Sequence, residues 1–346
     1  TGNCKQIYSF TSHNSMQDLK RLQDKVFNAN QSNSFELTLE VYQYQSKNNP
    51  VFRQFLELTG KLNQTINKFE DLCFLPVELF KSNTIKSGDW KEAAIFRSSG
   101  TSSEHRSCHY LENLSFYNRV SQICFEYHFG PLKNYEFLAL LPNYLERQDS
   151  SLVAMVSYFV NSANKYGKDV FFINDFEKLY VALNEFLRLD KPVMLFGVSF
   201  ALLDFANQFK IEFPNLTIIE TGGMKGRNRE IAKSSLLSQL KTAFPKAKIG
   251  SEYGMTELLS QAYAVDGVHY RSHPIIKFLI SDPADPFSFL PNSKRGIINV
   301  IDLANVHSCS FIQTGDLGEF NDNNELQVLG RFDFEELRGC SQLYEE

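Results

Sequence analysis

Long apolar runs are missing from this 346-residue sequence. A membrane-spanning helix needs about 18 apolar residues, and the longest candidate run, 193–206, contains Gly197 and Asp204. The first residues of the sequence also contain no apolar signal-peptide core. We therefore expect no stable membrane insertion and a cytoplasmic location.

Paired metal or disulfide ligands are also missing. The six cysteines are scattered without a CxxC pair, which in a chain this long favours reduced thiols over a disulfide framework. Zinc is disfavoured because structural zinc sites need paired ligands at short spacing. Two histidine pairs have four-residue spacing, but neither has an HExxH context or an adjacent third ligand: His105/His109 and His269/His273. His105 or His109 could instead orient a phosphate or a carboxylate.

Basic charge is not in excess. The chain has 35 Lys and Arg against 40 Asp and Glu, a formal charge of −5, so we expect no nucleic-acid partner. Tryptophan occurs once, whereas Phe occurs 31 times and Tyr 15 times, which predicts a Phe-rich core. The segments 171–172 and 196–200 could line an apolar pocket for a substrate, although core strands are the favoured interpretation.

Hydrophobic periodicity divides the chain into three parts. Residues 1–90 indicate a helical segment packed on the main domain, although alternation within 35–44 leaves helix and strand both open. Residues 91–260 alternate short apolar runs with helical patterns, which is typical of a mostly parallel sheet with helices on both faces. Residues 261–346 become β-rich. The pattern predicts an α/β fold with a smaller β-rich subdomain.

A hydroxyl-rich loop has the sharpest pattern. Residues 96–106 have the sequence Phe-Arg-Ser-Ser-Gly-Thr-Ser-Ser-Glu-His-Arg and follow a short apolar run. Successive small residues allow backbone N–H groups to converge on an anion, with hydroxyls and Arg106 as further donors to phosphate. The Walker A pattern GxxxxGK[ST] is missing. A plain Ser/Gly loop is the alternative.

Three further segments follow strand-like runs. Residues 219–226 place glycines at a strand end, where ligands bind in open α/β sheets, but lack the dinucleotide pattern GxGxxG. In residues 250–257 a threonine beside a carboxylate suits Mg²⁺, and Tyr253 offers a flat face to a base. Farther along, Asp316 can accept hydrogen bonds from ribose hydroxyls and Arg331 can pair with phosphate. Each segment alone also suits an ordinary turn or helix start.

Together and in this order, the segments resemble the signature series of the adenylate-forming superfamily. That superfamily includes acyl-CoA synthetases, luciferase-type ligases and peptide-synthetase adenylation domains, and the resemblance spans roughly residues 85–340. It implies the fold of their N-terminal domain. The matching elements are the phosphate loop (97–106), the adenine-side turn (Thr221-Gly222-Gly223), YGxTE (Tyr253–Glu257), TGD (Thr314–Asp316) and the hinge motif (Gly330–Asp333).

Departures from the superfamily pattern indicate one branch. The usual loop is SGTTGxPK, whereas here Ser102, Ser103 and Glu104 follow Thr101, and Arg106 stands near the lysine position. The sequence stops shortly after the hinge motif, so we expect the small C-terminal domain and its catalytic lysine to be absent. This combination resembles the acyl-protein synthetase family, the fatty-acid-activating component of bacterial bioluminescence, and its relatives.

The resemblance implies ATP-dependent activation of a carboxylic acid, fatty or aromatic, with ATP and Mg²⁺ as cofactors. It implies Cys340 as the acyl acceptor, in place of an ordinary surface thiol, and a reductase or carrier protein as the partner that takes the acyl group. Catalytic roles fall on Cys340, Arg106 and Glu257, the last also as the Mg²⁺ ligand. The nucleotide-binding candidates are Ser98, Ser99, Gly100, Thr101, Ser102, Gly222, Gly223, Tyr253, Gly254, Thr256, Asp316 and Arg331.

Two other functions stay open. An acyl- or aryl-CoA ligase would use the same motifs and pass the acyl group to CoA. A non-catalytic nucleotide-binding relative, acting as a binding or scaffold protein, would fit the altered loop and the missing lysine-bearing domain.

Overall fold

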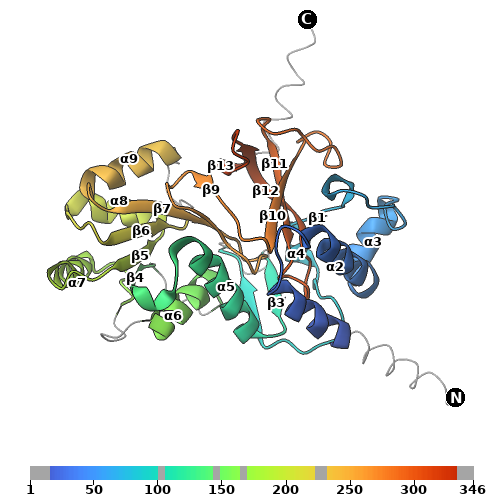
Figure 1. The fold of residues 1–346 in the computed structure, drawn as a ribbon, viewed down its shortest axis with the longest axis horizontal. Coiled ribbons are helices and arrows are strands. Elements are labelled where there is room, and N and C mark those ends of the chain that lie inside the picture. The colour runs from blue at the N-terminus through green and yellow to red at the C-terminus, as the bar shows by residue number, and fades with distance from the viewer. Residues whose placement is uncertain (1–15, 100–105, 143–148, 164–169, 223–231, 333–346) are drawn as a thin grey trace, which may run out of the picture.

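A computed structural model describes residues 16–99, 106–142, 149–163, 170–222 and 232–332. Figure 1 shows two sheets side by side, with helices around them. The helices are residues 16–26, α2 (Ser34–Asn48), α3 (Pro50–Leu58), α4 (Leu79–Ser82), α5 (Leu114–Phe129), α6 (Ser151–Ala163), α7 (Phe176–Arg188), α8 (Ser199–Gln208) and α9 (Lys233–Ala243), with 3₁₀ turns at Phe69–Asp71 and Leu132–Asn134. The strands are β1 (Leu75–Pro76), β2 (Ala94–Arg97), β3 (Cys108–Leu111), β4 (Glu136–Leu140), β5 (Val193–Gly197), β6 (Leu216–Glu220), β7 (Lys248–Tyr253), β8 (Ala262–Ala264), β9 (His269–Tyr270), β10 (Ile276–Ser281), β11 (Gly296–Asp302), β12 (Phe311–Phe320) and β13 (Leu326–Arg331).

The first sheet comes from the middle part of the chain and has the order β4-β5-β6-β7-β8. Strands β4 to β7 are parallel, and β8 returns antiparallel to β7. Every residue of β4 and β5 is buried, because helices cover both faces of a parallel sheet. In Figure 1, α8 and α9 lie on one side of this sheet and α5 and α6 on the other. The carboxyl ends of β5, β6 and β7 therefore meet at one edge.

The second sheet confirms the β-rich character of the last part of the chain. Its order is β10-β11-β12-β13-β9, and neighbouring strands are antiparallel. Strand β1 lies within residues 1–90, which the sequence predicts to be helical, and pairs parallel with β12, with Leu75 opposite Ile312. The N-terminal residues therefore contribute a strand to this sheet.

A short hairpin of β2 and β3 carries the hydroxyl-rich loop. Arg97 lies opposite Cys108, and Phe96 lies opposite His109, so residues 98–107 connect the two strands. The loop predicted to hold phosphate therefore lies between two paired strands in the sequence, and its described ends are residues 98–99 and 106–107.

Segment 35–44, left open between helix and strand, is helical. Leu37, Val41 and Tyr44 are buried at helical spacing, whereas Leu39 is only partly buried. Segment 250–257, expected to follow a strand, begins inside one, because β7 continues to Tyr253.

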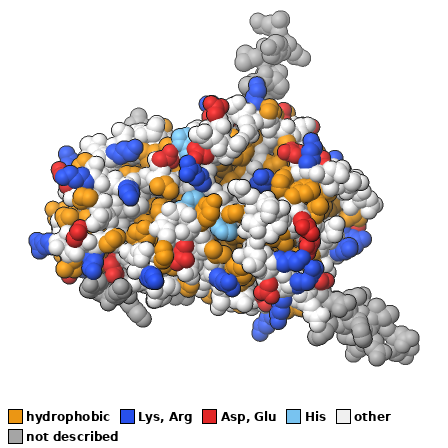
Figure 2. Space-filling view, viewed as in Figure 1, with side chains coloured by type: hydrophobic (Ala, Val, Ile, Leu, Met, Phe, Trp, Pro, Cys, Tyr) orange, Lys and Arg blue, Asp and Glu red, His pale blue; other side chains and the backbone are white. Residues whose placement is uncertain are grey.

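The core is rich in phenylalanine, as predicted. The rings of Phe125, Phe137, Phe159 and Phe196 form a cluster with centroid separations between 5.2 and 6.4 Å. Phe196 is fully buried in this cluster, so this part of segment 196–200 belongs to the core. On the face shown in Figure 2, basic and acidic side chains are interspersed. No helix in the described ranges has the length and apolarity that crossing a bilayer requires.

Candidate functional site

Two of the predicted motifs meet through a hydrogen bond. Tyr253 is the last residue of β7, Asp316 lies in β12, and 63 residues separate them in sequence. The Tyr253 hydroxyl donates to Asp316 Oδ2 at 2.8 Å. Burial and the nearby Asp316 carboxylate raise the pKa of Tyr253 well above its ordinary value. The phenol therefore stays protonated and remains a donor.

Asp316 is oriented from its other side as well. It faces Arg331 across β12 and β13, and Arg331 Nε lies 3.3 Å from Asp316 Oδ1. The backbone N–H of Asp316 donates to the Thr314 hydroxyl at 3.1 Å, and that hydroxyl donates to Ile298 O at 2.8 Å. The Asp316 side chain is 15% exposed and the Arg331 side chain 62% exposed. The carboxylate of the TGD element is thus held in place while part of it still faces solvent.

The Tyr253 ring is used mainly for packing. It is 8% exposed, and its centroid lies 5.9 Å from those of Tyr270 and Phe278, at steep angles to both. Gly254 follows it and is exposed. A Cβ at position 254 would lie 2.3 Å from Glu252 Oε1, so glycine leaves room for that carboxyl group beside the turn.

The TGG turn starts at a buried carboxylate. Glu220, the last residue of β6, is 2% exposed. Its carboxylate accepts from the Ser199 hydroxyl, accepts from the Gly222 N–H at 2.7 Å and pairs with the Lys233 ammonium. Gly222 has a φ of +73°, a conformation that favours glycine. The turn is therefore fixed by a buried charge together with its partner.

Glu252 is a second carboxyl group near this turn. Its removal from water and the neighbouring Glu220 carboxylate raise its pKa to about 8, while Lys233 acts in the opposite direction. Sequence reasoning does not assign Glu220 or Glu252 to the site. Their positions in the sequence are the one signal that could have found them, because Glu220 directly precedes the TGG turn and Glu252 directly precedes Tyr253.

The Thr256–Glu257 backbone is held by side chains from two distant segments. His109 Nδ1 lies 2.8 Å from Thr256 O, and Asn305 Nδ2 donates to Glu257 O at 2.8 Å. His109 Nε2 lies 2.9 Å from Asn305 Oδ1. Within the described chain, His109 therefore contacts a carbonyl and an amide oxygen instead of the phosphate or carboxylate considered from the sequence.

A buried carboxylate holds the residues that follow. Asp302, at the end of β11, is fully buried and accepts from the backbone N–H groups of Leu259 and Ser260. It also accepts from the Ser260 hydroxyl at 2.6 Å. Burial raises the pKa of Asp302 in spite of these bonds. Sequence reasoning missed Asp302 and Asn305, because neither lies in a recognisable motif.

Arg106 lies at the base of the hydroxyl-rich loop. Its Nη2 is 2.9 Å from Asp149 Oδ2, and its Nε donates to Ser98 O at 2.6 Å. The Ser98 hydroxyl accepts from the Ser107 N–H at 3.0 Å, whereas Ser99 is exposed. The guanidinium thus ties the two ends of the loop together and to Asp149.

The described motifs form one connected set of contacts. The Lys233 ammonium, paired with Glu220, lies 3.4 Å from the Tyr270 hydroxyl, and the Tyr270 ring packs on Tyr253. Tyr253 in turn reaches Asp316. The site therefore joins the TGG turn, the YGMTE element and the TGD element. The candidates Gly100, Thr101, Ser102, Gly223 and Cys340 lie outside the described residues.

No group of three or more His, Cys, Asp or Glu side chains in the described part of the chain is placed to hold a metal. Mg²⁺ bound with a nucleotide usually needs only one or two carboxylates plus the phosphates. The Thr256–Glu257 pair, with a carboxylate that is 5% exposed, fits that smaller requirement.

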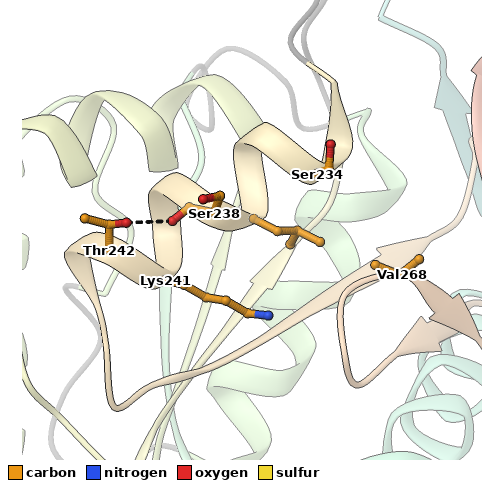
Figure 3. Close-up of a pocket in the computed structure, with 6 residues that line it drawn as sticks. Ser234, Ser238, Lys241, Thr242 and Val268 are labelled. Carbon is orange, nitrogen blue, oxygen red and sulfur yellow. Dashed lines mark hydrogen bonds between the residues drawn. The ribbon is translucent and has the colours of Figure 1, made fainter.

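A shallow groove lies apart from these motifs, between α9 and the loop before β9 (Figure 3). None of the predicted site residues lines it. The lining residues are Ser234, Leu237, Ser238, Lys241, Thr242 and Val268.

Comparison with known proteins shows similarity at the level of the fold. No protein-family model matches the sequence, and no curated protein matches it. ATP-bound MatB from Rhodopseudomonas palustris is 19% identical with a TM-score of 0.52, covering 72% of this chain and 50% of MatB. An open conformation of 2-hydroxyisobutyryl-CoA ligase, in complex with 2-HIB-AMP and CoA, is 14% identical with a TM-score of 0.62. That match covers 92% of this chain and 69% of the ligase.

The same ligase in its postadenylation state, with R3-HIB-AMP, is also similar, with a TM-score of 0.59 at 14% identity over 92% of this chain and 68% of the ligase. This chain thus has the mixed α/β fold of the N-terminal domain of adenylate-forming enzymes, which confirms the predicted fold. It spans about half the length of MatB.

Proposed function

We propose that this protein activates a carboxylic acid with ATP, forming an acyl-adenylate and releasing pyrophosphate. The observation that carries the proposal is the 2.8 Å hydrogen bond between Tyr253 of the YGMTE element and Asp316 of the TGD element. Elements that serve one nucleotide must meet in space, and these two do. Fold neighbours with ATP bound and with 2-HIB-AMP bound support the same choice of substrate.

The reaction is a displacement at the α-phosphorus of ATP. A carboxylate oxygen of the acid attacks that phosphorus, the bond to the β-phosphate bridging oxygen breaks, and pyrophosphate leaves. The protein contributes mainly positioning and charge neutralisation. Asp316, oriented by Tyr253 and Arg331, accepts hydrogen bonds from the ribose hydroxyls, and Arg331 adds a secondary contact to ribose or phosphate. Gly222 and Gly223 are the residues assigned to the adenine side of the nucleotide.

The hydroxyl-rich loop is the proposed pyrophosphate site. Its hydroxyls and backbone N–H groups donate to phosphate oxygens, and Arg106 at its base adds positive charge. Phosphate donors come from five successive positions: Ser98, Ser99, Gly100, Thr101 and Ser102.

The Thr256–Glu257 pair is the proposed site for Mg²⁺. A hard cation takes oxygen ligands, and the Glu257 carboxylate supplies one next to the Thr256 hydroxyl. Thr256 and Glu257 would hold the Mg²⁺, which would supply positive charge to offset that of the phosphates.

We assign the acyl acceptor to Cys340. Its thiol loses a proton to solvent, the sulfur attacks the acyl carbon, and the carbon–oxygen bond to AMP breaks so that AMP leaves. The acyl group, held as a thioester on Cys340, can then pass to a reductase or carrier protein. Free CoA is the second candidate acceptor, favoured by the CoA bound to the 2-hydroxyisobutyryl-CoA ligase. Intact-protein mass spectrometry after incubation with ATP and acid separates them. An adduct lost in Cys340→Ser supports the cysteine, whereas CoA consumption without an adduct supports the ligase.

Exchange of labelled pyrophosphate into ATP tests the activation step. We expect exchange that depends on the added acid, across a panel of fatty acids of increasing chain length and aromatic acids. Asp316→Ala should abolish it, because the ribose contact is lost. Asp285→Asn, at an exposed carboxylate in the turn after β10, is the matched control and should leave the rate unchanged. No exchange with any acid of the panel contradicts the proposal.

A further inference from the structure

One buried histidine joins the hydroxyl-rich hairpin to the YGMTE element. His109 lies on β3 and is 0% exposed. Its Nδ1 lies 2.8 Å from Thr256 O, and its Nε2 lies 2.9 Å from Asn305 Oδ1. Asn305 then donates to Glu257 O at 2.8 Å. The imidazole ring thus reaches the carbonyl of Thr256 directly and that of Glu257 through one amide.

We propose that His109 is a positioning residue, which holds the backbone of Thr256 and Glu257 in the orientation that binds the Mg²⁺ of ATP. This role rests on the proposed function, because Mg²⁺ enters through the nucleotide. His109 itself contacts neither the nucleotide nor the metal. It acts through the two carbonyls and the peptide planes that carry the Thr256 hydroxyl and the Glu257 carboxylate.

The hydrogen-bond chemistry of this network leaves little freedom. Thr256 O and Glu257 O only accept, so each needs an N–H donor. With Asn305 oriented to donate to Glu257 O, its own oxygen faces His109 Nε2. Turning the amide over would place that oxygen against Glu257 O, so the orientation is fixed by its neighbours. The neutral ring has one N–H, and with that proton on Nδ1 it donates to Thr256 O, while Nε2 lies beside Asn305 Oδ1 with no donor between them. Removing the His109 ring would therefore leave Thr256 O without its donor.

Two aromatic rings also pack on His109. Phe80 of α4 lies edge-on at 6.1 Å, and His307 is stacked at 5.8 Å with an interplanar angle of 3°. His307 is 1% exposed, and neither of its ring nitrogens makes a hydrogen bond within the described chain. Burial lowers the pKa of both histidines, to about 4 for His109 and about 3 for His307.

The second histidine offers a matched control. His307 has the same size and nearly the same burial as His109 and stacks on it, but within the described chain it makes no hydrogen bond to the Thr256–Glu257 backbone. Replacing either histidine by phenylalanine preserves the stacked pair of rings. Only the change at His109 removes the donor to Thr256 and the contact to Asn305.

Binding of Mn²⁺ with ATP, followed by electron paramagnetic resonance of the full chain, tests the role without turnover. We expect His109→Phe to weaken Mn²⁺ binding in the presence of ATP by about tenfold, because the backbone of the proposed Mg²⁺ site loses one hydrogen bond that orients it. His307→Phe should stay within about twofold of the parent protein. His109→Asn, whose amide can still donate toward Thr256, should lie between them. Equal losses in the two phenylalanine variants would overturn the proposal.

Two further measurements keep the result decisive. If His109→Phe does not fold, Asn305→Ala removes the contact to Glu257 while leaving the ring, and the same comparison with His307→Phe applies. Nitrogen NMR of the histidine rings without nucleotide tests the contact itself, with the His109 signal assigned by its loss in His109→Asn. We expect the ring proton to lie on Nδ1, the nitrogen that donates to Thr256 O. A His109 ring whose Nδ1 carries no proton would overturn the role, whereas parent protein that shows the protonated Nδ1 but binds no ATP would count against the proposed function alone.

Discussion

The Lys233 ammonium pairs with the Glu220 carboxylate at the carboxyl end of β6, and the two partners differ sharply in exposure. The Glu220 side chain is 2% exposed and the Lys233 side chain 34% exposed. Lys233 therefore lies toward solvent and supplies the positive charge that offsets the buried Glu220 carboxylate below the TGG turn.

Removal of this partner should destabilise the fold. Lys233→Met leaves the Glu220 charge buried with hydrogen bonds but no cation, and we expect a loss of about 3 kcal/mol in the free energy of unfolding. The double variant Lys233→Met/Glu220→Gln should recover part of that loss, because the amide is uncharged. Urea denaturation measures both. A single variant as stable as the parent protein would contradict the interpretation of this pair.

Loss of the Tyr253 hydroxyl should weaken nucleotide binding more than catalysis. Tyr253→Phe removes the 2.8 Å bond that orients Asp316 but leaves the packing of the ring. A hydrogen bond of this kind contributes about 1 kcal/mol, so we expect KM for ATP to rise about fivefold with kcat nearly unchanged. The control is Tyr135→Phe, which removes a phenol bond to Phe129 O from a different part of the fold. If the two variants changed KM for ATP equally, the Tyr253 hydroxyl would have no specific role in nucleotide binding.

Stability should depend on pH through Glu252. Its pKa is about 8 in the folded protein against an ordinary 4.5, so the folded state holds a proton that the unfolded chain releases. This contribution is fully present below pH 4.5 and is lost as the pH rises through about 8. The slope between these values is at most about 1.4 kcal/mol per pH unit, reduced by the partial exposure of the side chain.

Glu252→Gln isolates the contribution of Glu252 to the pH dependence of stability, because the amide keeps the size of the side chain and does not titrate. Denaturant unfolding at about pH 5 and about pH 8 should show a smaller loss of stability in the variant than in the parent protein. A pH dependence identical in both proteins would show that Glu252 does not titrate in this range.

The fold and the order of the motifs could be predicted from the sequence, because both rest on local patterns. Alternating apolar runs and helical periods predicted the parallel sheet, and the glycines after residue 219 predicted the turn at the end of one of its strands. Helix α2 shows where such patterns stop being informative. Alternation at Leu37, Leu39 and Val41 suited a strand equally well, and the helical face became clear only from the burial of Thr38 and Gln45.

The contacts that hold the site could not be predicted, because they join segments far apart in the chain. Gln45 is buried because its amide donates to Asn305 O and Val306 O, about 260 residues away. Asn305 in turn reaches Glu257 O, and Asp302 holds the backbone of Leu259. None of these side chains lies in a motif. Their role depends on which loops the two sheets bring together.

The central claim is that the acid attacks the α-phosphorus of ATP. Incubation with an acid carrying ¹⁸O in its carboxyl group tests this directly, with mass spectrometry of the AMP and pyrophosphate that are released. The account predicts one ¹⁸O atom in AMP and none in pyrophosphate, because the attacking oxygen stays on the α-phosphorus when the acyl group is transferred. Label in pyrophosphate would contradict the account. So would AMP that carries no label although it forms in proportion to the acid consumed.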